Sequence, residues 1–370
     1  MHRVLVGLFL FTVAGVAAAQ PPAAPAPSAA TGAIQPDPYT GAHAADLVVT
    51  SDGTQQPVGF CQDGGGPTRY IDMRFLLLKQ TGPAQKEPLI LYTLTSSTGV
   101  QTDTYRTGVV NTGLSLGVHV LFGQWTNHDT AYEFGGTYID PFFYKRSFDA
   151  ITVGGSNFSS GFRSTVTFLP TQASFDGIDV YYQTQHWGLE SNLRRRLSEN
   201  DCRWLDAIVG LRYHQIHERY FIDASPVNGA RVIESYNTGN DIFGVQLGFE
   251  GDRKLIGYWS LRAAAKYVLG VDWQYQSFRG TPGEGLLTND AVRGYHQDAR
   301  FGNFADLSLA VVAKLTPNIE TSLGATALLF GGIKRAADTF DFSNLDNPTL
   351  KSGQDWMALY GLQWTVKIDF

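Results

Sequence analysis

The stretch WSLRAAAKYVLGVDWQY, residues 259–275, decides the fold because its side chains alternate strictly between two kinds. All nine odd positions are apolar or aromatic, and the even positions include Arg262, Lys266 and Asp272. An extended strand places successive side chains on opposite faces. Strands of soluble proteins usually have about 5–6 residues, whereas a tilted strand that crosses a membrane needs about 9–11. The length of this stretch therefore predicts a transmembrane β-strand.

The same alternation recurs in Ala305–Leu315 and in Leu205–Tyr213. In residues 259–275 the aromatic side chains stand at both ends of the apolar face, with Ala and Leu between them. Lipid-facing bands of transmembrane barrels are flanked by aromatic girdles in this way. We therefore predict an all-β protein that folds as an antiparallel transmembrane β-barrel.

Short and long connections follow one another between the alternating segments. Outer-membrane barrels have short periplasmic turns and longer external loops. Four connections are short and five are long, which predicts ten strands with both termini in the periplasm. The short ones lie near residues 127–130, 198–201, 251–257 and 316–318, and the long ones near 81–111, 142–172, 225–237, 279–303 and 333–355.

The ten predicted strands account for about half of residues 67–370. Residues 89–92 or 164–169 could form one more pair, so a twelve-strand barrel remains an alternative. The predicted strands are 69–80, 112–125, 131–140, 176–197, 203–223, 239–250, 258–276, 304–315, 319–331 and 356–370.

The last strand carries the most specific signal. Its even positions from Trp356 to Phe370 are apolar or aromatic, and polar or small residues stand between most of them. An alternating strand that ends in Phe resembles the signal read by the β-barrel assembly machinery. We therefore predict that Phe370 is part of the assembly signal, that this machinery is a partner and that the protein resides in the cell outer membrane, in contact with its lipid.

The N-terminal residues predict export. A short basic start is followed by an apolar stretch that closes on Ala17-Ala18-Ala19, as in a secretory signal peptide of residues 1–19. Residues 20–66 are rich in Pro and Ala, and we expect a largely disordered periplasmic segment there. The barrel would then span residues 67–370. Because the periplasm is oxidising, a disulfide between Cys61 and Cys202 is one option that the sequence leaves open.

Composition and motifs exclude several classes of function. The net charge of −6 shows no basic excess, which argues against nucleic acid as a partner. Beyond residue 20 no apolar run is long enough for a membrane-spanning helix. His214 and His217 would lie on opposite faces of one strand, a poor arrangement for a metal ion. The chain has no nucleophile elbow, P-loop or HExxH motif, so we predict neither an enzyme nor a cofactor.

Polar side chains on the inward faces of the predicted strands are the candidate site residues. We expect a porin-like channel for passive diffusion of small polar solutes, and a plugged barrel with a structural or surface-interaction role is the alternative. Eight-stranded barrels are filled by side chains and barrels of 16–18 strands are open, so ten strands lie near the narrow end. The predicted pore-lining residues are Arg194, Asp206, Arg212, His214, Glu250, Arg262, Lys266, Asp272, Lys314, Glu320 and Lys367.

Opposite charges near the predicted turns lead to two further expectations about the interior. We expect three ion pairs across neighbouring strands, and hence a lumen with weak charge selectivity. The loop of residues 142–172 contains several apolar side chains, which predicts that part of it folds into the mouth or the lumen. The expected ion pairs are Arg194 with Asp206, Glu250 with Arg262, and Lys314 with Glu320.

Three of the strand motifs also resemble those of a known family. They are RWLDAIVGLRY (203–213, with Glu218 shortly after), WGLESNLRR (187–195) and NTGNDIFGVQLG (237–248). In their order and spacing they are similar to the putative beta-barrel porin-7 family, over roughly residues 69–370. The resemblance implies an outer-membrane barrel of the porin kind, and it implies no substrate or site residues.

Overall fold

The computed structural model describes residues 47–49, 55–57, 69–82, 88–96, 99–106, 110–127, 129–149, 161–164, 175–200, 202–226, 232–281, 292–336 and 354–370. The predicted signal peptide lies outside these residues. Of the predicted segment 20–66, the short strands β1 (Leu47–Val49) and β2 (Gln55–Pro57) are described, and they pair antiparallel. They belong to a compact unit of residues 1–58, separate from residues 59–370. No helix in the described ranges is long and apolar enough to cross a membrane.

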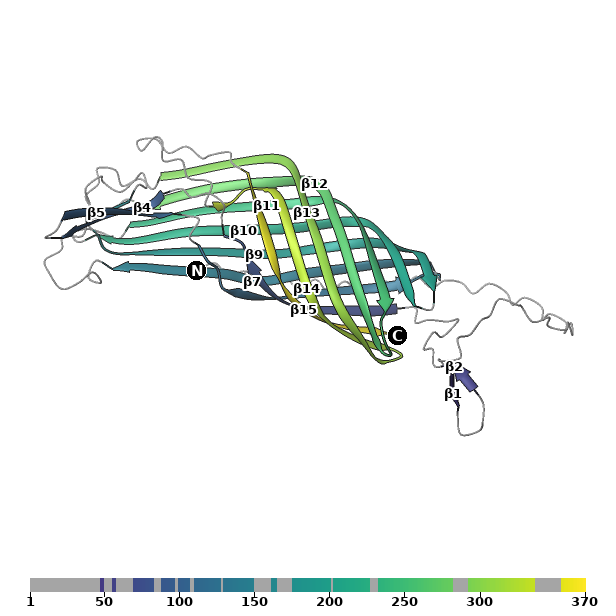
Figure 1. The fold of residues 1–370 in the computed structure, drawn as a ribbon. Coiled ribbons are helices and arrows are strands. Elements are labelled where there is room, and N and C mark those ends of the chain that lie inside the picture. The colour runs from purple at the N-terminus through teal and green to yellow at the C-terminus, as the bar shows by residue number, and fades with distance from the viewer. Residues whose placement is uncertain are drawn as a thin grey trace, which may run out of the picture. The chain divides into compact units, whose positions relative to one another are not determined.

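Ten antiparallel strands of the second unit close into a barrel (Figure 1). All ten coincide with predicted strands, so the prediction of a ten-strand barrel is confirmed. Around the barrel the order is β10-β11-β12-β13-β14-β15-β3-β6-β7-β9. The strands are β3 (Arg69–Gln80), β6 (Leu114–Trp125), β7 (Thr130–Asp149), β9 (Phe175–Asn200), β10 (Arg203–Pro226), β11 (Val232–Lys254), β12 (Trp259–Thr281), β13 (Val292–Thr316), β14 (Ile319–Ile333) and β15 (Asp355–Asp369).

Of the two segments that suggested a twelve-strand barrel, residues 89–92 and residue Ser164 lie in a separate sheet, and residues 165–169 lie outside the described residues. Strands β4 (Pro88–Ser96), β5 (Gly99–Arg106) and β8 (Gly161–Ser164) pair antiparallel in the order β5-β4-β8. None of the three is hydrogen-bonded to a barrel strand in the described sheets. The alternative of twelve barrel strands is therefore wrong.

The barrel closes between its last strand and its first. Strand β15 pairs with β3, and Arg69 and Phe370 exchange backbone hydrogen bonds of 3.1 and 2.8 Å. The Asp369 amide donates to the carbonyl of Asn318 in the short β13–β14 turn. Both ends of the barrel sequence therefore lie with the short turns, which we call the turn end. A periplasmic position of the turn end remains a prediction.

The two faces of the strands differ as the alternation predicted. On β12 the odd residues from Trp259 to Trp273 are exposed and the even residues from Lys266 to Gln276 are mostly buried. The exposed residues form an apolar outer band with aromatic side chains at both margins, as lipid-facing surfaces have. The inward face carries the buried core side chains, so the interior of the barrel is filled by packed side chains.

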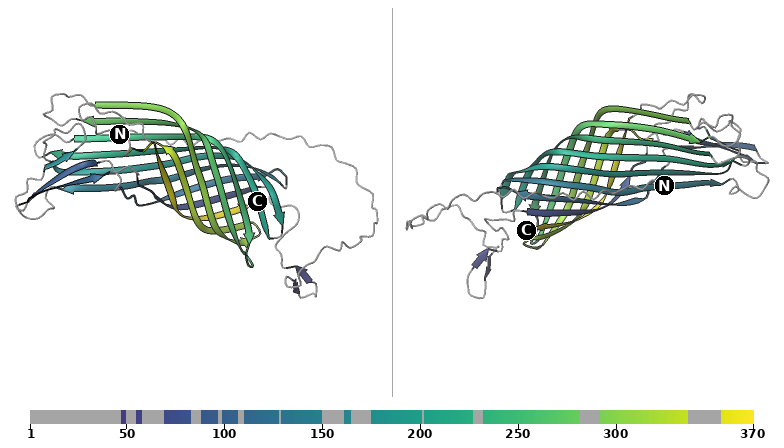
Figure 2. Two further views of the ribbon diagram at one scale, coloured as in Figure 1. Left: turned by 45° about the horizontal axis from the view of Figure 1, so that its top comes forward. Right: turned by 180° about the vertical axis from the view of Figure 1, so that it is seen from behind.

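Six neighbouring strands extend past the other four. Strands β7 and β9 to β13 have 20–26 residues, whereas β14, β15, β3 and β6 have 12–15. Figure 2 shows the long strands continuing beyond the ends of the short ones. We call the six-strand extension the wall. The predicted strands 131–140, 239–250 and 304–315 were too short because they ended where the wall begins.

The outer face of the wall explains this error. Within the outer band, outward residues such as Leu211 and Leu269 are apolar. Above the band, outward residues such as Gln215, Asp241 and Gln297 are polar, and the Gln215 amide donates to Asp241 at 2.6 Å. The apolar alternation therefore stops while the hydrogen-bonded ladder continues.

One row of inward glycines brings three strands together. Gly244 lies opposite Gly270, which lies opposite Gly302 on the next strand. A Cβ atom on Gly270 would stand 2.0 Å from the carbonyl oxygen of Phe243. The backbones approach too closely here for any side chain, which explains why glycine occupies the inward position.

Candidate functional site

The predicted pore-lining residues lie on the inward faces of the barrel strands, but most of them are closed off from solvent. Glu320, Lys367 and Arg262 are partly exposed, and Lys314 is exposed at the turn end. An open, water-filled lumen would leave its lining accessible. The buried members of the set are Arg194, Asp206, Arg212, His214, Glu250, Lys266 and Asp272.

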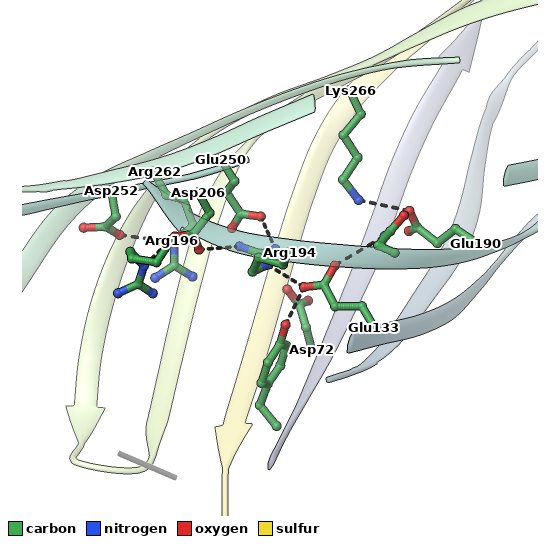
Figure 3. Close-up of polar contacts among 12 residues, drawn as sticks. Asp72, Glu133, Glu190, Arg194, Arg196, Asp206, Glu250, Asp252, Arg262 and Lys266 are labelled. Carbon is green, nitrogen blue, oxygen red and sulfur yellow. Dashed lines mark hydrogen bonds and ion pairs between the residues drawn. The ribbon is translucent and has the colours of Figure 1, made fainter. Parts of the chain in front are cut away.

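Arg194 is the centre of a charge layer at the turn end (Figure 3). Its guanidinium group binds Glu133 at 2.6 Å, Asp206 at 3.1 Å and Glu250 at 2.7 Å. These acids come from β7, β10 and β11, while Arg194 comes from β9 between them. The Tyr70 hydroxyl on β3, two strands from β7 around the barrel, donates to Glu133. These contacts therefore link side chains from five strands, β3, β7, β9, β10 and β11.

Glu190 is a second centre, further from the turn end. Its carboxylate lies 2.7 Å from His119 Nε2 and accepts hydrogen bonds of 3.0 Å from both Lys266 and Gln246. All four side chains are buried. A buried carboxylate is tolerated when its oxygens are paired and hydrogen-bonded in this way. The charge layer is thus a closed and largely satisfied network.

Of the three predicted ion pairs, only Arg194 with Asp206 is formed. Asp252, not Glu250, lies opposite Arg262 and binds it at 3.1 Å. Strand β11 continues through residues 251–254, which the sequence suggested as a turn, and the register shifts accordingly.

The two residues of the third predicted ion pair have the predicted register but do not bind each other. Lys314 lies opposite Glu320 as predicted, but Glu320 binds Arg262 at 2.8 Å. Lys314 is exposed and forms no ion pair among the described residues. The partner of a charged lumen residue therefore depends on how far its side chain extends across the barrel, and not only on which residue lies opposite it on the adjacent strand.

An aromatic layer closes the lumen above the charge layer. The rings of Phe304 and Phe330 lie 5.2 Å apart between centroids and are tilted by 35°, and the imidazole centroid of His214 lies 4.8 Å from that of Phe330. His186 contacts the edge of Phe142, and its Nδ1 is 3.4 Å from His214 Nε2. These five side chains come from five different strands. Phe142, Phe304 and Phe330 belong to one buried hydrophobic cluster that also contains aliphatic side chains from other strands.

The third layer is formed by residues that follow β14. Arg335 is fully buried and donates to Glu218 at 2.9 Å and to the Tyr182 hydroxyl at 2.8 Å. It also reaches the backbone carbonyls of Thr81 and Trp356, at 3.4 and 3.5 Å. Arg335 thereby ties the wall strands β9 and β10 to the ends of the short strands.

Neighbouring residues hold this segment in place. The Lys334 amide donates to Asn240 at 2.6 Å, and Asn240 returns a hydrogen bond of 2.8 Å to the Lys334 carbonyl. The Ala336 amide donates to Glu218 at 2.8 Å. Gly332 has a φ of +74°, a left-handed conformation that lets the chain leave β14 and turn inward. We call residues 334–336 the plug segment.

The loop of residues 142–172, which the sequence predicts to fold partly into the mouth or the lumen, is described only in part. Residues 142–149 of the predicted loop 142–172 continue β7, and residues 161–164 form β8. The rest of that loop lies outside the described residues. Sequence analysis missed the plug segment, because Lys334 and Arg335 are charged residues next to a long polar connection and resemble a solvated surface.

Cys202 is exposed and has a free thiol. Cys61 itself lies outside the described residues. His214 is buried in the aromatic layer, whereas His217 is exposed, as the alternation predicted. The described part of the chain has no group of three or more His, Cys, Asp or Glu side chains placed to hold a metal ion.

Comparisons with solved structures find other outer-membrane barrels. The outer membrane protease OmpT from Escherichia coli is 10% identical with a TM-score of 0.39, over 83% of this chain and 99% of that chain. The translocator domain of the autotransporter NalP from Neisseria meningitidis is 11% identical with a TM-score of 0.33, over 83% and 90%. The toluene transporter TodX from P. putida is 9% identical with a TM-score of 0.25, over 84% and 91%. These identities are too low to transfer an activity.

A family model matches most of the barrel. No curated protein matches the chain. The model described as putative beta barrel porin-7 (BBP7) matches residues 73–356, from β3 into β15. This range includes all three strand motifs that suggested the family. The chain therefore belongs to the BBP7 family and is a β-barrel protein of the outer membrane.

Proposed function

We propose that the protein is a closed outer-membrane barrel with a structural or surface-interaction role, carried by the wall and the connections at its end. The plug segment is the observation that carries this proposal. Arg335 is fully buried, and its contacts reach across the interior from Glu218 to the end of β3. Of the three layers in the described interior, this one lies furthest from the turn end.

The two deeper layers support the same proposal. The rings of Phe304, Phe330 and His214 pack against one another, and the charges around Arg194 and Glu190 are bound to each other. A continuous path would require these buried ion pairs to separate and the rings to part. Three closed layers in series make spontaneous opening of a continuous path unfavourable.

The family description favours a second function, passive diffusion of small polar solutes. A lumen with polar side chains such as Glu190 and Lys266 would suit such solutes once it were open. This function requires the plug segment to leave the interior and the aromatic layer to part. Small polar solutes are then the partner class, and the β-barrel assembly machinery serves the protein under either function.

We propose that the protein is not an enzyme. The acids and histidines of the interior that suggest acid–base chemistry, His119 beside Glu190 above all, are buried within the charge layer. A substrate would have to displace Lys266 and Gln246 to reach them. Their bonds to one another support a structural role.

Single-channel recording in planar bilayers tests the proposal. The purified full-length protein should give no stable conductance steps. A triple variant, Phe304→Gly with Phe330→Gly and Arg335→Gly, removes the bulk of the upper two layers and should conduct. Heat-modifiable migration on gels must show that the variant is folded.

Stable steps from the unmodified protein would reject the closed barrel and support passive diffusion. An Arg219→Gly variant serves as the control, because Arg219 is exposed on the outer face of the wall. It should behave like the unmodified protein in the same recordings.

A further inference from the structure

Two arginines stand side by side on the outer face of the barrel at the turn end. Arg203, the first residue of β10, lies directly opposite Arg253 of β11, and both side chains are exposed. They share their face with the outward residues Leu205 and Phe249. Side chains directly opposite on antiparallel strands have Cβ atoms about 4.5–5.5 Å apart. Two positive charges are therefore held within one hydrogen-bonded pair of strands.

No carboxylate neutralises this pair in the part of the chain that the structure describes. Asp206 and Asp252 are near in sequence, but they face the interior, where they bind Arg194 and Arg262. Like charges directly opposite one another destabilise a sheet. An arrangement of this kind becomes favourable when an anion from outside the chain lies between the two guanidinium groups.

The surroundings place the pair at the margin of the outer band. One row further into the band the outward residues include Leu205 and Ala263. On the other side, the β11–β12 turn exposes Ile256, Tyr258 and Trp259. Aromatic side chains beside an apolar band mark the level of the lipid headgroups. Arg203 and Arg253 thus lie where a headgroup phosphate is found.

We propose that Arg203 and Arg253 form a binding site for the phosphate of an anionic phospholipid. Arginine suits this role because its planar guanidinium group binds phosphate oxygens in a bidentate manner. The acyl chains of the lipid would lie along the apolar row that begins at Leu205. This site is independent of whether the lumen conducts.

Native mass spectrometry of the full-length protein in neutral detergent tests the site. The probes are phosphatidylglycerol and, at equal concentration, phosphatidylethanolamine. The unmodified protein should retain phosphatidylglycerol preferentially. An Arg203→Gln/Arg253→Gln variant should bind it about tenfold more weakly or worse, since the loss of one charge-assisted hydrogen bond is enough for that change.

Two further variants separate the site from general effects of charge. Arg279→Gln removes an exposed arginine at the far end of β12 and should leave lipid retention unchanged. Arg253→Glu creates an opposite-charge pair with Arg203, so it should abolish retention while the barrel melts at the same or a higher temperature. Equal retention by the folded double variant would overturn the proposal. Displacement of the lipid by equimolar inorganic phosphate would also overturn it, because the site would then serve free phosphate.

Discussion

Glu218 and Arg335 are 117 positions apart in the sequence, and their side chains meet in the interior of the barrel at 2.9 Å. Both are fully buried. Removing water from two such charges is costly, and the attraction between them roughly offsets that cost only while both are present. Each residue therefore depends on the other.

Arg335→Ala should lower the free energy of unfolding by about 3–5 kcal/mol, because it leaves the charge of Glu218 buried without an opposite charge. The double variant Glu218→Leu/Arg335→Met should recover most of this loss. Urea-induced unfolding in lipid vesicles measures both. Costs that simply add in the double variant would contradict the coupling.

The boundary of the outer band can be tested on β13. Leu309→Arg places a cation within the band and should cost about 2–4 kcal/mol of barrel stability, as expected near the bilayer midplane. Gln297→Arg, on the same face of the same strand but above the band, should cost about 0–1 kcal/mol. Equal costs for the two variants would mean that the wall lies within the membrane.

The glycine row should be intolerant of a methyl group. Gly270→Ala brings Cβ to 2.0 Å from a backbone carbonyl oxygen and should destabilise the barrel by about 1–3 kcal/mol through overpacking. Gly113→Ala is the control, because nothing lies within 4 Å of the Cβ it would add. Thermal unfolding followed by circular dichroism compares them, and a neutral Gly270→Ala would refute the close approach.

Phe370→Lys should reduce the yield of folded barrel in the outer membrane, because Phe370 ends the alternating strand that resembles an assembly signal. Phe342→Lys, within the long connection after β14, is the matched control and should leave the yield unchanged. Heat-modifiable migration of membrane fractions measures the folded share. Similar yields from the two variants would count against the assembly signal.

The alternation made the ten strands predictable because the membrane demands an apolar outer face wherever a strand meets lipid. Leu309 and Leu211 carry that signal, and their strands were located correctly. Gln297 and Gln215 do not carry this signal, because the wall has polar residues on its outer face. The length of the wall could therefore not be predicted. Hydrogen bonds of the ladder hold these residues in strands without leaving a pattern in the sequence.

The interior was harder to predict than the faces. That Arg194 and Asp206 point inward follows from alternation along one strand, but that Arg194 also binds Glu133 and Glu250 depends on which strands meet around the closed barrel. The burial of Arg335 depends on the turn at Gly332 and on a cavity shaped by distant strands. Contacts of this kind are properties of the closed ring, and no local pattern encodes them.

The position of the plug segment in the chain has a consequence for the order of assembly. Residues 334–336 lie between β14 and β15, and β15 forms the last pair, with β3. The polypeptide that seals the lumen is therefore delivered by the same hairpin that completes the ring. Glu218 and Asn240, which receive the plug segment, belong to strands synthesised earlier. We expect sealing and ring completion to be a single late event, so that an unfinished barrel is also an unsealed one.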